Sequence, residues 1–252
     1  MTTQDYALLP DLNHRVALVT GGSRGIGRAI AIALASAGAA IAVNYRQRAD
    51  EAHQVVAQIE SAGGRALAVR ADVSAASEVT SMIGEIERSL GAVDVLVNNA
   101  GTGTFSDIES ITEAEFDHTL AVNLKSAFLC TQAVLPGMRA RRWGRIVNLS
   151  SVAARGAGAV GVHYNASKAG LEGLTRGYAS RVAREGVTVN AVAPGPIDTE
   201  MAAPLKAANI AERLPVGRLG EADEVAQVVL MVVGNAFVTG QTIAVNGGIS
   251  FI

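Results

Sequence analysis

The chain has 252 residues, of which 49% are hydrophobic and 17% charged, with 21 basic against 23 acidic side chains. This length suits one large α/β domain, and the balanced charge excludes a global field that would attract nucleic acid or an anionic membrane, so we expect a small-molecule partner. A single cysteine, Cys130, cannot form an internal disulfide, and its apolar neighbours predict a buried structural thiol. We find no signal-peptide pattern and no apolar run of roughly 20 residues, and therefore expect a soluble cytoplasmic protein.

Short runs rich in Val, Ile and Ala predict strands that are buried on both faces. They cover residues 16–19, 40–43, 66–69, 93–97, 145–149, 187–192 and 242–245. Longer segments with helical periodicity separate them. This alternation predicts a single-domain Rossmann fold over residues 1–252, with a doubly wound seven-stranded parallel sheet and helices on both faces. Residues 1–9 are expected to form an arm outside the sheet.

A glycine-rich segment, Thr20-Gly-Gly-Ser-Arg-Gly-Ile-Gly27, follows the first predicted strand and precedes a helical run at 28–36. Glycines here permit a tight turn and let backbone amides approach a pyrophosphate, which the N-terminus of the helix attracts. The segment therefore predicts a dinucleotide-binding loop. Its candidate cofactor residues are Gly21, Ser23, Arg24, Gly25, Ile26 and Gly27.

Cofactor choice is predicted from the end of the second strand, which has the sequence Asn44-Tyr45-Arg46. A site for an unphosphorylated adenosine ribose needs an Asp or Glu there, and this segment has none. Arg46 together with Arg24 could hold a 2′-phosphate through charge-assisted hydrogen bonds. We therefore expect NADP(H) to be preferred, with NAD(H) possible.

The alternative is that Arg46 and Arg48 only solvate the start of the next helix, with Asp50 as its N-cap. After the third predicted strand, Asp72 and Val73 are placed to contact the adenine edge of a cofactor. Asp72 could equally be an ordinary turn residue.

Tyr164 and Lys168 are four positions apart. On a helix this spacing puts the phenol and the ammonium on one face, where the cation can tune the acidity of the phenol. Taken alone, the pair is more often a half-buried tyrosine beside a solvated lysine.

Four further segments complete a recognisable pattern. They are Asn98-Asn99-Ala100-Gly101 after the fourth predicted strand, Asn123, Ser151, and Pro194-Gly195-Pro196-Ile197-Asp198-Thr199. With the glycine loop, Asp72, Tyr164 and Lys168, these ordered segments resemble the short-chain dehydrogenase/reductase family over essentially the whole chain. The combination favours the catalytic interpretation of Tyr164.

The resemblance implies that Tyr164 is the general acid/base, which protonates a carbonyl oxygen or deprotonates an alcohol. Lys168 and an oxidised nicotinamide would lower the pKa of Tyr164, and Lys168 would also bind the nicotinamide ribose. Ser151 would hydrogen-bond the substrate oxygen. Asn123 would hold, through its side chain or backbone, a water that links Lys168 to solvent. Alternatively, the Asn123 amide is a satisfied group inside a helix.

The resemblance also implies further cofactor contacts and a substrate lid. The cofactor contacts are Asn99, Ala100, Gly101, Pro194, Gly195, Ile197 and Thr199. Residues at about 197–216, Ala-rich and with apolar side chains at near-helical spacing, would form a mobile lid over a hydrophobic substrate pocket. An ordinary packed helix is the alternative.

Segments 144–148, 215–220 and 239–248 resemble those of 3-oxoacyl-(acyl-carrier-protein) reductases, and also of broader carbonyl and alcohol oxidoreductases. A carrier protein would require exposed cations near the mouth of the site, and four arginines form a candidate patch: Arg139, Arg141, Arg142 and Arg145. Cations also suit a helix C-terminus without any partner. Carrier-using relatives place a second basic residue shortly before the segment that corresponds to 186–190, whereas Glu185 directly precedes it here, although Arg184 adjoins it. This departure counts against a dedicated carrier-protein enzyme.

The resulting prediction is an NADPH-dependent oxidoreductase that reduces a 3-oxoacyl or other small ketone to a secondary alcohol, without a metal site. An NAD-dependent secondary alcohol or sugar dehydrogenase is the alternative, and a non-catalytic nucleotide-sensing protein is a remote one. Relatives associate through the helices expected at 120–139 and 164–184, and the tail at 249–252 could pack across a second axis, so a homotetramer is expected. The choice of ketone is expected to depend on the lid and on the surroundings of His163.

Overall fold

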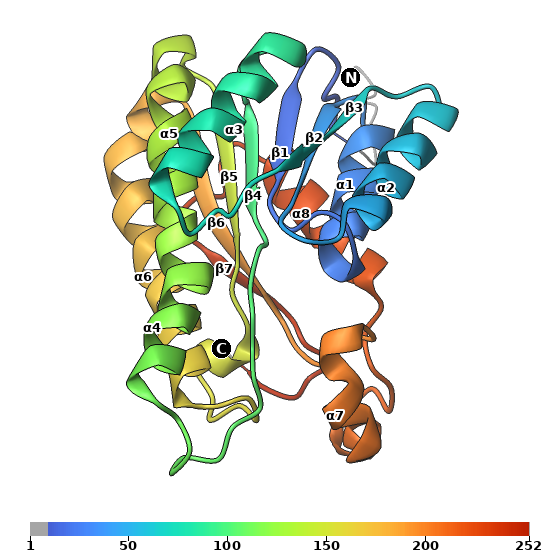
Figure 1. The fold of residues 1–252 in the computed structure, drawn as a ribbon, viewed down its shortest axis with the longest axis vertical. Coiled ribbons are helices and arrows are strands. Elements are labelled where there is room, and N and C mark those ends of the chain that lie inside the picture. Colours follow the sequence, from blue (N-terminus) through green and yellow to red (C-terminus); the bar gives the residue numbers. More distant parts are fainter. Residues whose placement is uncertain (1–9, 252) are drawn as a thin grey trace, which may run out of the picture.

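A central all-parallel sheet of seven strands organises the computed structural model, which describes residues 10–251 (Figure 1). The strands are β1 Val16–Val19, β2 Ala40–Tyr45, β3 Ala66–Arg70, β4 Val95–Asn98, β5 Gly144–Leu149, β6 Val187–Pro194 and β7 Thr242–Val245. Their order is β3-β2-β1-β4-β5-β6-β7, and every neighbouring pair is parallel. The predicted Rossmann fold is confirmed. The arm predicted at residues 1–9 lies outside the described residues.

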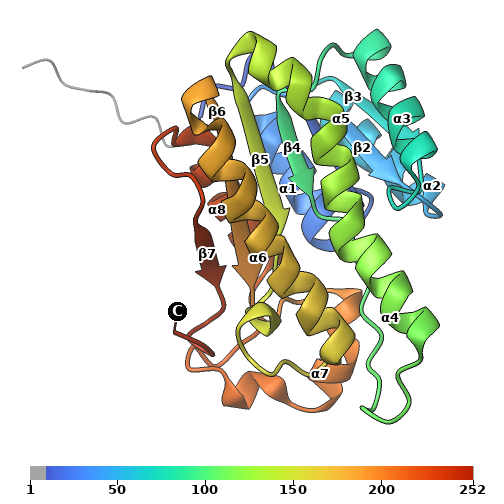
Figure 2. The same cartoon turned by 90° about the vertical axis from the view of Figure 1, so that its left-hand side faces the viewer.

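Helices cover both faces of the sheet, as Figures 1 and 2 show from two sides. One face carries α1 Gly25–Ser36, α2 Ala49–Ser61 and α8 Ala222–Gly234. The other carries α3 Ala76–Ser89, α4 Glu113–Leu120, α5 Ser126–Arg141 and α6 Val162–Val182. This double covering explains why the strands are apolar on both faces, as is typical of parallel sheets.

The strands divide their side chains between two hydrophobic cores. In β1, Ala17 and Val19 pack into the core beneath α1, α2 and α8, whereas Val16 and Leu18 pack into the core beneath α3, α5 and α6. This division follows from the period of two along a strand. Cys130 lies fully buried in the second core, and burial raises the pKa of its thiol to about 12. The predicted structural role of this cysteine is confirmed.

Two helix starts differ from the prediction. α1 begins at Gly25, three residues before the predicted run, because the second half of the glycine loop forms its first turn. α2 begins at Ala49 after Arg48, so Asp50 lies in the first turn and the prediction that it caps the helix is wrong. An acid in this turn is still favourable, since it faces the positive end of the helix dipole.

The helix predicted at 120–139 contains an irregular turn. α4 runs into a π-helical turn, η1 Ala121–Lys125, which continues directly into α5. Such turns accommodate an additional residue and are frequent at functional sites. This one contains Asn123.

Residues 197–216 are helical only in short pieces: η4 Glu200–Ala202, α7 Ala203–Ala207 and η5 Ile210–Arg213. Asn209, with φ of 52°, ends α7 and breaks the expected continuity. The start of the segment is held near the residues that follow its end, because the amide of Asp198 donates to the carbonyl of Gly220 at 2.8 Å. Figure 1 shows α7 beyond the carboxyl ends of the strands.

The four arginines of the candidate carrier-protein patch lie at the opposite, amino-terminal edge of the sheet, where β5 begins. Arg139 pairs with Glu185, Arg141 pairs with Asp94 at 3.3 Å, and Arg145 is buried. A patch near the mouth of the site was therefore the wrong interpretation, because these arginines contact the segments before β4 and after α6 and the end of α8.

Within residues 10–251, none of the helices is long and apolar enough to cross a membrane. The same residues contain no group of three or more His, Cys, Asp or Glu side chains arranged to hold a metal ion.

Candidate active site

The glycine loop lies at the point where the sheet changes winding direction, between the carboxyl ends of β1 and β4. Asn99, just after β4, donates from its amide nitrogen to the carbonyls of Thr20 at 2.9 Å and Gly21 at 3.0 Å. A Cβ at Gly27 would lie 2.3 Å from the Gly21 carbonyl oxygen, so only glycine fits there. The loop is thus a compact backbone cradle at the N-terminus of α1, which is a site suited to a pyrophosphate.

Asn44, at the end of β2, links the glycine loop to the neighbouring strand. Its side-chain oxygen accepts from the amide of Gly21 at 3.2 Å, and its nitrogen donates to the carbonyl of Ala71 at 3.1 Å. Although Asn44 borders the cavity, its hydrogen-bonding groups are engaged by the protein. Its visible role is to fix the loop in place.

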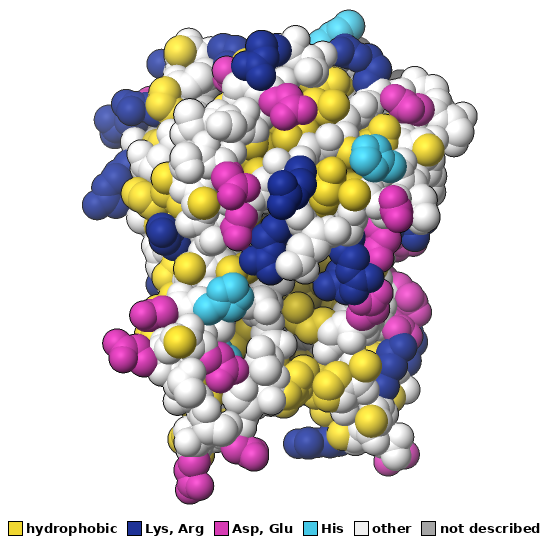
Figure 3. Space-filling view, viewed as in Figure 1, with side chains coloured by type: hydrophobic (Ala, Val, Ile, Leu, Met, Phe, Trp, Pro, Cys, Tyr) yellow, Lys and Arg dark blue, Asp and Glu magenta, His cyan; other side chains and the backbone are white. Residues whose placement is uncertain are grey.

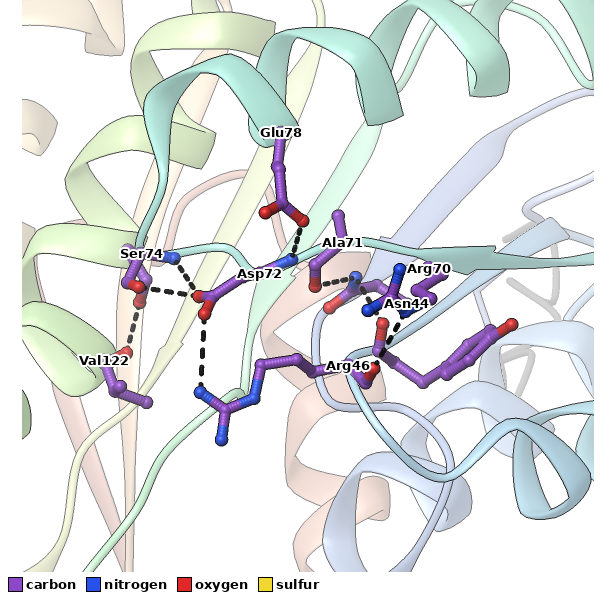
Figure 4. Close-up of polar contacts among 10 residues, drawn as sticks. Asn44, Arg46, Arg70, Ala71, Asp72, Ser74, Glu78 and Val122 are labelled. Carbon is purple, nitrogen blue, oxygen red and sulfur yellow. Dashed lines mark hydrogen bonds and ion pairs between the residues drawn. The ribbon is translucent and has the colours of Figure 1, made fainter.

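Charged side chains surround the neighbouring end of the cavity, and Figure 3 shows basic side chains in dark blue close to acidic ones in magenta on this face. Arg46 points toward Asp72 and approaches its carboxylate at 3.4 Å (Figure 4). Arg24 pairs with Glu200, and Arg48 approaches the same carboxylate at 3.4 Å. Arg24 and Arg46, which the sequence predicts to meet a 2′-phosphate, therefore face the same cavity.

Asp72 combines a structural role with its position at the cavity. Its Oδ1 accepts from the Ser74 amide at 2.9 Å and from the Ser74 hydroxyl at 2.6 Å. Partial burial acts to raise the pKa of Asp72, but these hydrogen bonds and Arg46 outweigh it and leave the pKa below its usual value. Asp72 stabilises the turn after β3 through Ser74, and both Asp72 and Val73 also line the cavity. A role in the turn and a position for contact with the cofactor are therefore compatible.

Tyr164, Lys168 and Ser151 meet at the other end of the same cavity. Lys168, buried on α6, donates from Nζ to the carbonyl of Leu149 at 2.7 Å, and its Nζ lies 5.5 Å from the centre of the Tyr164 ring. Ser151 extends from the end of β5 and accepts from the amide of Ala153 at 3.1 Å. The predicted spacing on one helix face therefore does bring the phenol and the ammonium together.

The pKa of Tyr164 in this cofactor-free structure is shifted in the opposite direction to the lowering expected when the oxidised cofactor is bound. Burial raises the pKa of the Tyr164 phenol, and hydrogen bonding with Ser151 opposes the rise only in part. Burial also lowers the pKa of Lys168 to about 8. In the cofactor-free protein Tyr164 is therefore a protonated phenol, ready to donate rather than to accept a proton.

The side chain of Asn123 is fully engaged with neighbouring protein groups. Its oxygen accepts from the amide of Thr102 at 2.7 Å, and its nitrogen donates to the carbonyl of Thr102 at 2.9 Å and to the hydroxyl of Ser167 at 3.0 Å. The side chain of Asn123 therefore matches the alternative prediction, that of an amide whose hydrogen bonds are satisfied within the protein. Asn123 fixes the segment after β4 against α6, the helix of Tyr164.

The remaining predicted cofactor residues also border the cavity. They are Ser23, Gly25, Ile26, Tyr45, Ala100, Gly101, Pro194, Gly195, Ile197 and Thr199. A Cβ at Gly195 would lie 2.8 Å from the backbone of Asn246, and one at Gly25 would lie 3.4 Å from the side chain of Thr199. The segment after β6 thus passes close to both β7 and the glycine loop.

The cavity has a volume of about 960 Å³, large enough for a dinucleotide and a small substrate together. Apolar side chains in its wall include Phe105, Val160, Met201 and Leu205. His163 does not border it. This imidazole is fully buried, without hydrogen-bond partners among the described residues, and its Nε2 lies 3.7 Å from Glu115 of α4, whereas Val160 and Tyr164 on either side of it line the cavity.

Comparison with known proteins agrees with this geometry. The model of the short chain dehydrogenase family matches residues 15–210. The chain belongs to the short chain dehydrogenase family. It is 42% identical over 240 residues to the 3-oxoacyl-[acyl-carrier-protein] reductase of Synechocystis sp., covering 94% of this chain and 97% of that protein.

Two further proteins define the resemblance. The acetoacetyl-CoA reductase of Shinella zoogloeoides is 42% identical over 244 residues, covering 94% of this chain and 99% of that protein. The crystal structure of a blue fluorescent protein from a metagenomic library, in complex with NADPH, superposes with a TM-score of 0.89 at 38% identity and covers 96% of this chain and all of that one. This short chain dehydrogenase is therefore an enzyme of an oxidoreductase family, as the sequence predicts.

Sequence reasoning missed several groups that support the site of this short chain dehydrogenase. The Thr20 hydroxyl accepts from the amides of Asn99 and Ala100, each at 3.0 Å. Buried Glu172, one turn after Lys168, accepts from Arg155 at 2.8 Å and from the Ser150 hydroxyl at 3.3 Å. In the sequence, these residues are indicated only by their positions beside the glycine loop, Ser151 and Lys168.

Glu200 was also missed. It comes directly after the predicted contact Thr199 but pairs with arginines that precede it by 176 and 152 positions. No local spacing indicates such a contact.

Proposed function

We propose that the protein is an NADPH-dependent ketoreductase that reduces a 3-oxoacyl or other small ketone to a secondary alcohol. The observation that carries this proposal is the convergence of Tyr164, Lys168 and Ser151 at the apolar end of a cavity whose other end is a glycine cradle with two arginines. The relatives named as a 3-oxoacyl-[acyl-carrier-protein] reductase and an acetoacetyl-CoA reductase support a ketone within an acyl thioester.

Tyr164 supplies the proton of this reaction. Its raised pKa keeps the phenol protonated, and in the reduction this proton passes to the carbonyl oxygen while hydride, supplied by the bound cofactor, adds to the carbonyl carbon. Ser151 orients the carbonyl oxygen and stabilises the charge that develops on it. Lys168 holds the nicotinamide ribose and stabilises the phenolate that remains.

Reprotonation of Tyr164 then passes through Lys168. With its side chain engaged by Thr102 and Ser167, Asn123 can contribute only its backbone carbonyl to holding the linking water. This assignment makes Asn123 both a support for the loop after β4 and a member of the proton path.

The preference for NADPH is assigned to Arg24 and Arg46. Their guanidinium groups border the cavity, and arginine binds phosphate through charge-assisted, bidentate hydrogen bonds. The glycine cradle fits a pyrophosphate because a Cβ at Gly27 would fill it. The similar solved structure that contains NADPH supports the same choice.

Residues 197–216, called the lid segment from here on, are proposed to cover the substrate. The segment lies beyond the carboxyl ends of the strands and contributes Met201, Leu205 and Ile210 to the cavity wall. These side chains would exclude water and contact the apolar part of the substrate.

We also propose that the enzyme is a cytoplasmic homotetramer. An apolar groove of about 510 Å³ lies between α4, α5 and α6, lined by Leu120, Leu124, Phe128 and Leu174. Phe128 is 44% exposed, and covering it with the same helices of a second copy would bury this surface. Mass measurement in solution tests the assignment, and a monomer at micromolar concentration would contradict it.

The function is tested by following the absorbance of NADPH and NADH with purified protein. Acetoacetyl-CoA, a 2-oxo ester and an aryl ketone serve as substrates, and secondary alcohols and sugars with NAD⁺ test the reverse direction. We expect the highest kcat/KM with NADPH and acetoacetyl-CoA. Preference for NAD⁺ with a sugar or alcohol would replace the proposal by its alternative, and absence of turnover with every pair would favour a nucleotide-sensing protein.

A further inference from the structure

The lid segment is joined to the phosphate end of the cavity through one carboxylate. Glu200, at the start of η4, pairs with Arg24 of the glycine loop, and Arg48 approaches the same carboxylate at 3.4 Å. The three side chains are half exposed, with 64% for Glu200, 50% for Arg24 and 49% for Arg48. All three border the cavity.

These arginines belong to a group of cations that acids of the same chain already neutralise. Arg46 pairs with Asp72 at 3.4 Å, and Arg48 also pairs with Glu51 at 2.6 Å. Glu51 and Asp72 lie 3 and 26 positions from their partners, whereas Glu200 follows its partners by 176 and 152 positions. Glu200 is thus the one carboxylate of this group that belongs to the lid segment.

A guanidinium that is engaged by a carboxylate offers fewer N–H donors to a phosphate. Carboxylate and phosphate oxygens both accept hydrogen bonds from the same N–H groups of the planar guanidinium, and a phosphate with nearly two negative charges is the stronger acceptor. The contact between Glu200 and Arg24 is exposed, so it is weak enough to be exchanged. Binding of a 2′-phosphate therefore requires Arg24 to leave Glu200, at least in part.

We propose that Glu200 is a specificity-determining residue whose carboxylate competes with the 2′-phosphate of the cofactor for Arg24 and Arg48. The inference rests on the proposed use of NADPH. Its consequence is a coupling between cofactor and lid: when the phosphate takes Arg24, the first turn of the lid segment loses its attachment to the glycine loop. NADH, which lacks this phosphate, leaves the attachment in place.

The competition is measured with ligands that isolate the phosphate. Adenosine 2′,5′-bisphosphate and adenosine 5′-monophosphate differ only in the 2′-phosphate, and calorimetry gives their dissociation constants for wild type and Glu200→Gln. NADPH and NADH form a second pair. Glu212→Gln is the matched control, because Glu212 is an exposed acid of the same lid segment without an ion pair among the described residues.

In Glu200→Gln we expect adenosine 2′,5′-bisphosphate and NADPH to bind about two- to fivefold more tightly, which is the size of an exposed ion pair. The monophosphate and NADH should bind as in wild type, Glu212→Gln should behave as wild type, and the gain should fade as salt is raised. Unchanged or weaker binding of the bisphosphate would overturn the proposal, since Glu200 would then be inert or would orient Arg24 toward the phosphate. An equal gain in Glu212→Gln would also overturn it, by reducing the effect to net charge.

The same data separate this inference from the proposed function. A wild-type protein that favours the bisphosphate over the monophosphate, with no change in Glu200→Gln, refutes only the role of Glu200. A wild-type protein that binds NADH at least as tightly as NADPH refutes the proposed cofactor preference.

Discussion

The two ends of the cavity are built from different kinds of interaction. At the catalytic end, Lys168 is buried and bonded to a backbone carbonyl, and its neighbour Asn123 has no free side-chain group. At the phosphate end, Arg24, Arg46 and Arg48 are half exposed and paired with carboxylates. Buried, satisfied networks hold one geometry, whereas exposed ion pairs are weak and exchangeable.

This difference teaches how the two tasks are divided. Proton transfer needs groups fixed within a fraction of an ångström before the substrate arrives. Recognition of a phosphate needs cations that can exchange one anion for another. Substitutions at the catalytic end should therefore change the rate, and those at the phosphate end should change affinity and salt dependence.

The largest effect is expected for Tyr164→Phe, which removes the proton donor and keeps the ring. Turnover of a ketone with NADPH should fall by about 10²- to 10⁴-fold, while the dissociation constant of NADPH stays unchanged. Initial rates and a fluorescence titration measure the two quantities. Tyr178→Phe on the same helix, where the hydroxyl accepts from the side-chain amide of Gln132 outside the cavity, should retain activity. Turnover retained in Tyr164→Phe would remove this residue from the mechanism.

The second prediction concerns the glycine cradle, which belongs to the phosphate end of the cavity. In Gly27→Ala the new Cβ would lie 2.3 Å from the Gly21 carbonyl oxygen and 2.5 Å from the Asn99 amide nitrogen. The loop must shift, and we expect both NADPH and NADH to bind on the order of 100-fold more weakly. Gly84→Ala in α3 is the control, because its Cβ meets only the end of the Arg88 side chain at 3.4 Å and should leave binding intact. Normal affinity in Gly27→Ala would show that the cradle is not the pyrophosphate site.

The third prediction follows from the buried ammonium of Lys168. Its pKa falls from 10.5 to about 8 on folding, so between these values the unfolded chain binds more protons than the native one. Stability should therefore rise with pH over this window. From pH 7.5 to 9.5, wild type should gain about 2 kcal/mol in free energy of unfolding relative to Lys168→Met. Urea titrations at the two pH values measure the difference, and parallel pH dependence of the two proteins would contradict it.

The smallest of these four effects is expected at the phosphate end, for Arg46→Ala. NADPH should bind about tenfold more weakly, because the variant loses a charge-assisted hydrogen bond to the 2′-phosphate. Part of this loss is offset, because wild-type Arg46 must give up its contact with Asp72 to bind the phosphate and the variant has no such contact to break. Affinity for NADH should not change, and the difference should shrink at high salt. Arg28→Ala, whose side chain bonds to Gln58 outside the cavity, should match wild type. Equal weakening of both cofactors would exclude a phosphate contact for Arg46.

The fold could be predicted because its signals are local. Runs of Val, Ile and Ala indicate strands buried on two sides, and the spacing between Tyr164 and Lys168 brings their side chains to one helix face. His163 shows the limit of such reasoning. It adjoins Tyr164 in sequence, but successive helical residues point about 100° apart, so it packs against α4 while Tyr164 borders the cavity.

Contacts between distant exposed side chains could not be predicted. The pairing of Glu200 with Arg24 joins segments 176 positions apart and depends on how the lid segment folds back. The same reason explains the wrong interpretation of Arg139, Arg141, Arg142 and Arg145. A cluster of charges in sequence does not specify the edge of the sheet on which it lies.

The π-helical turn between α4 and α5 restricts which chain lengths this enzyme can tolerate. Deleting one residue from Ala121–Lys125 would restore a regular helix and rotate everything before the deletion by about 100° relative to α5. The amide of Asn123 would then leave Thr102 and Ser167. Apart from changes at Asn123, we expect substitutions in this stretch to be accepted far more readily than insertions or deletions, because only a change in length alters the register between α4 and α5.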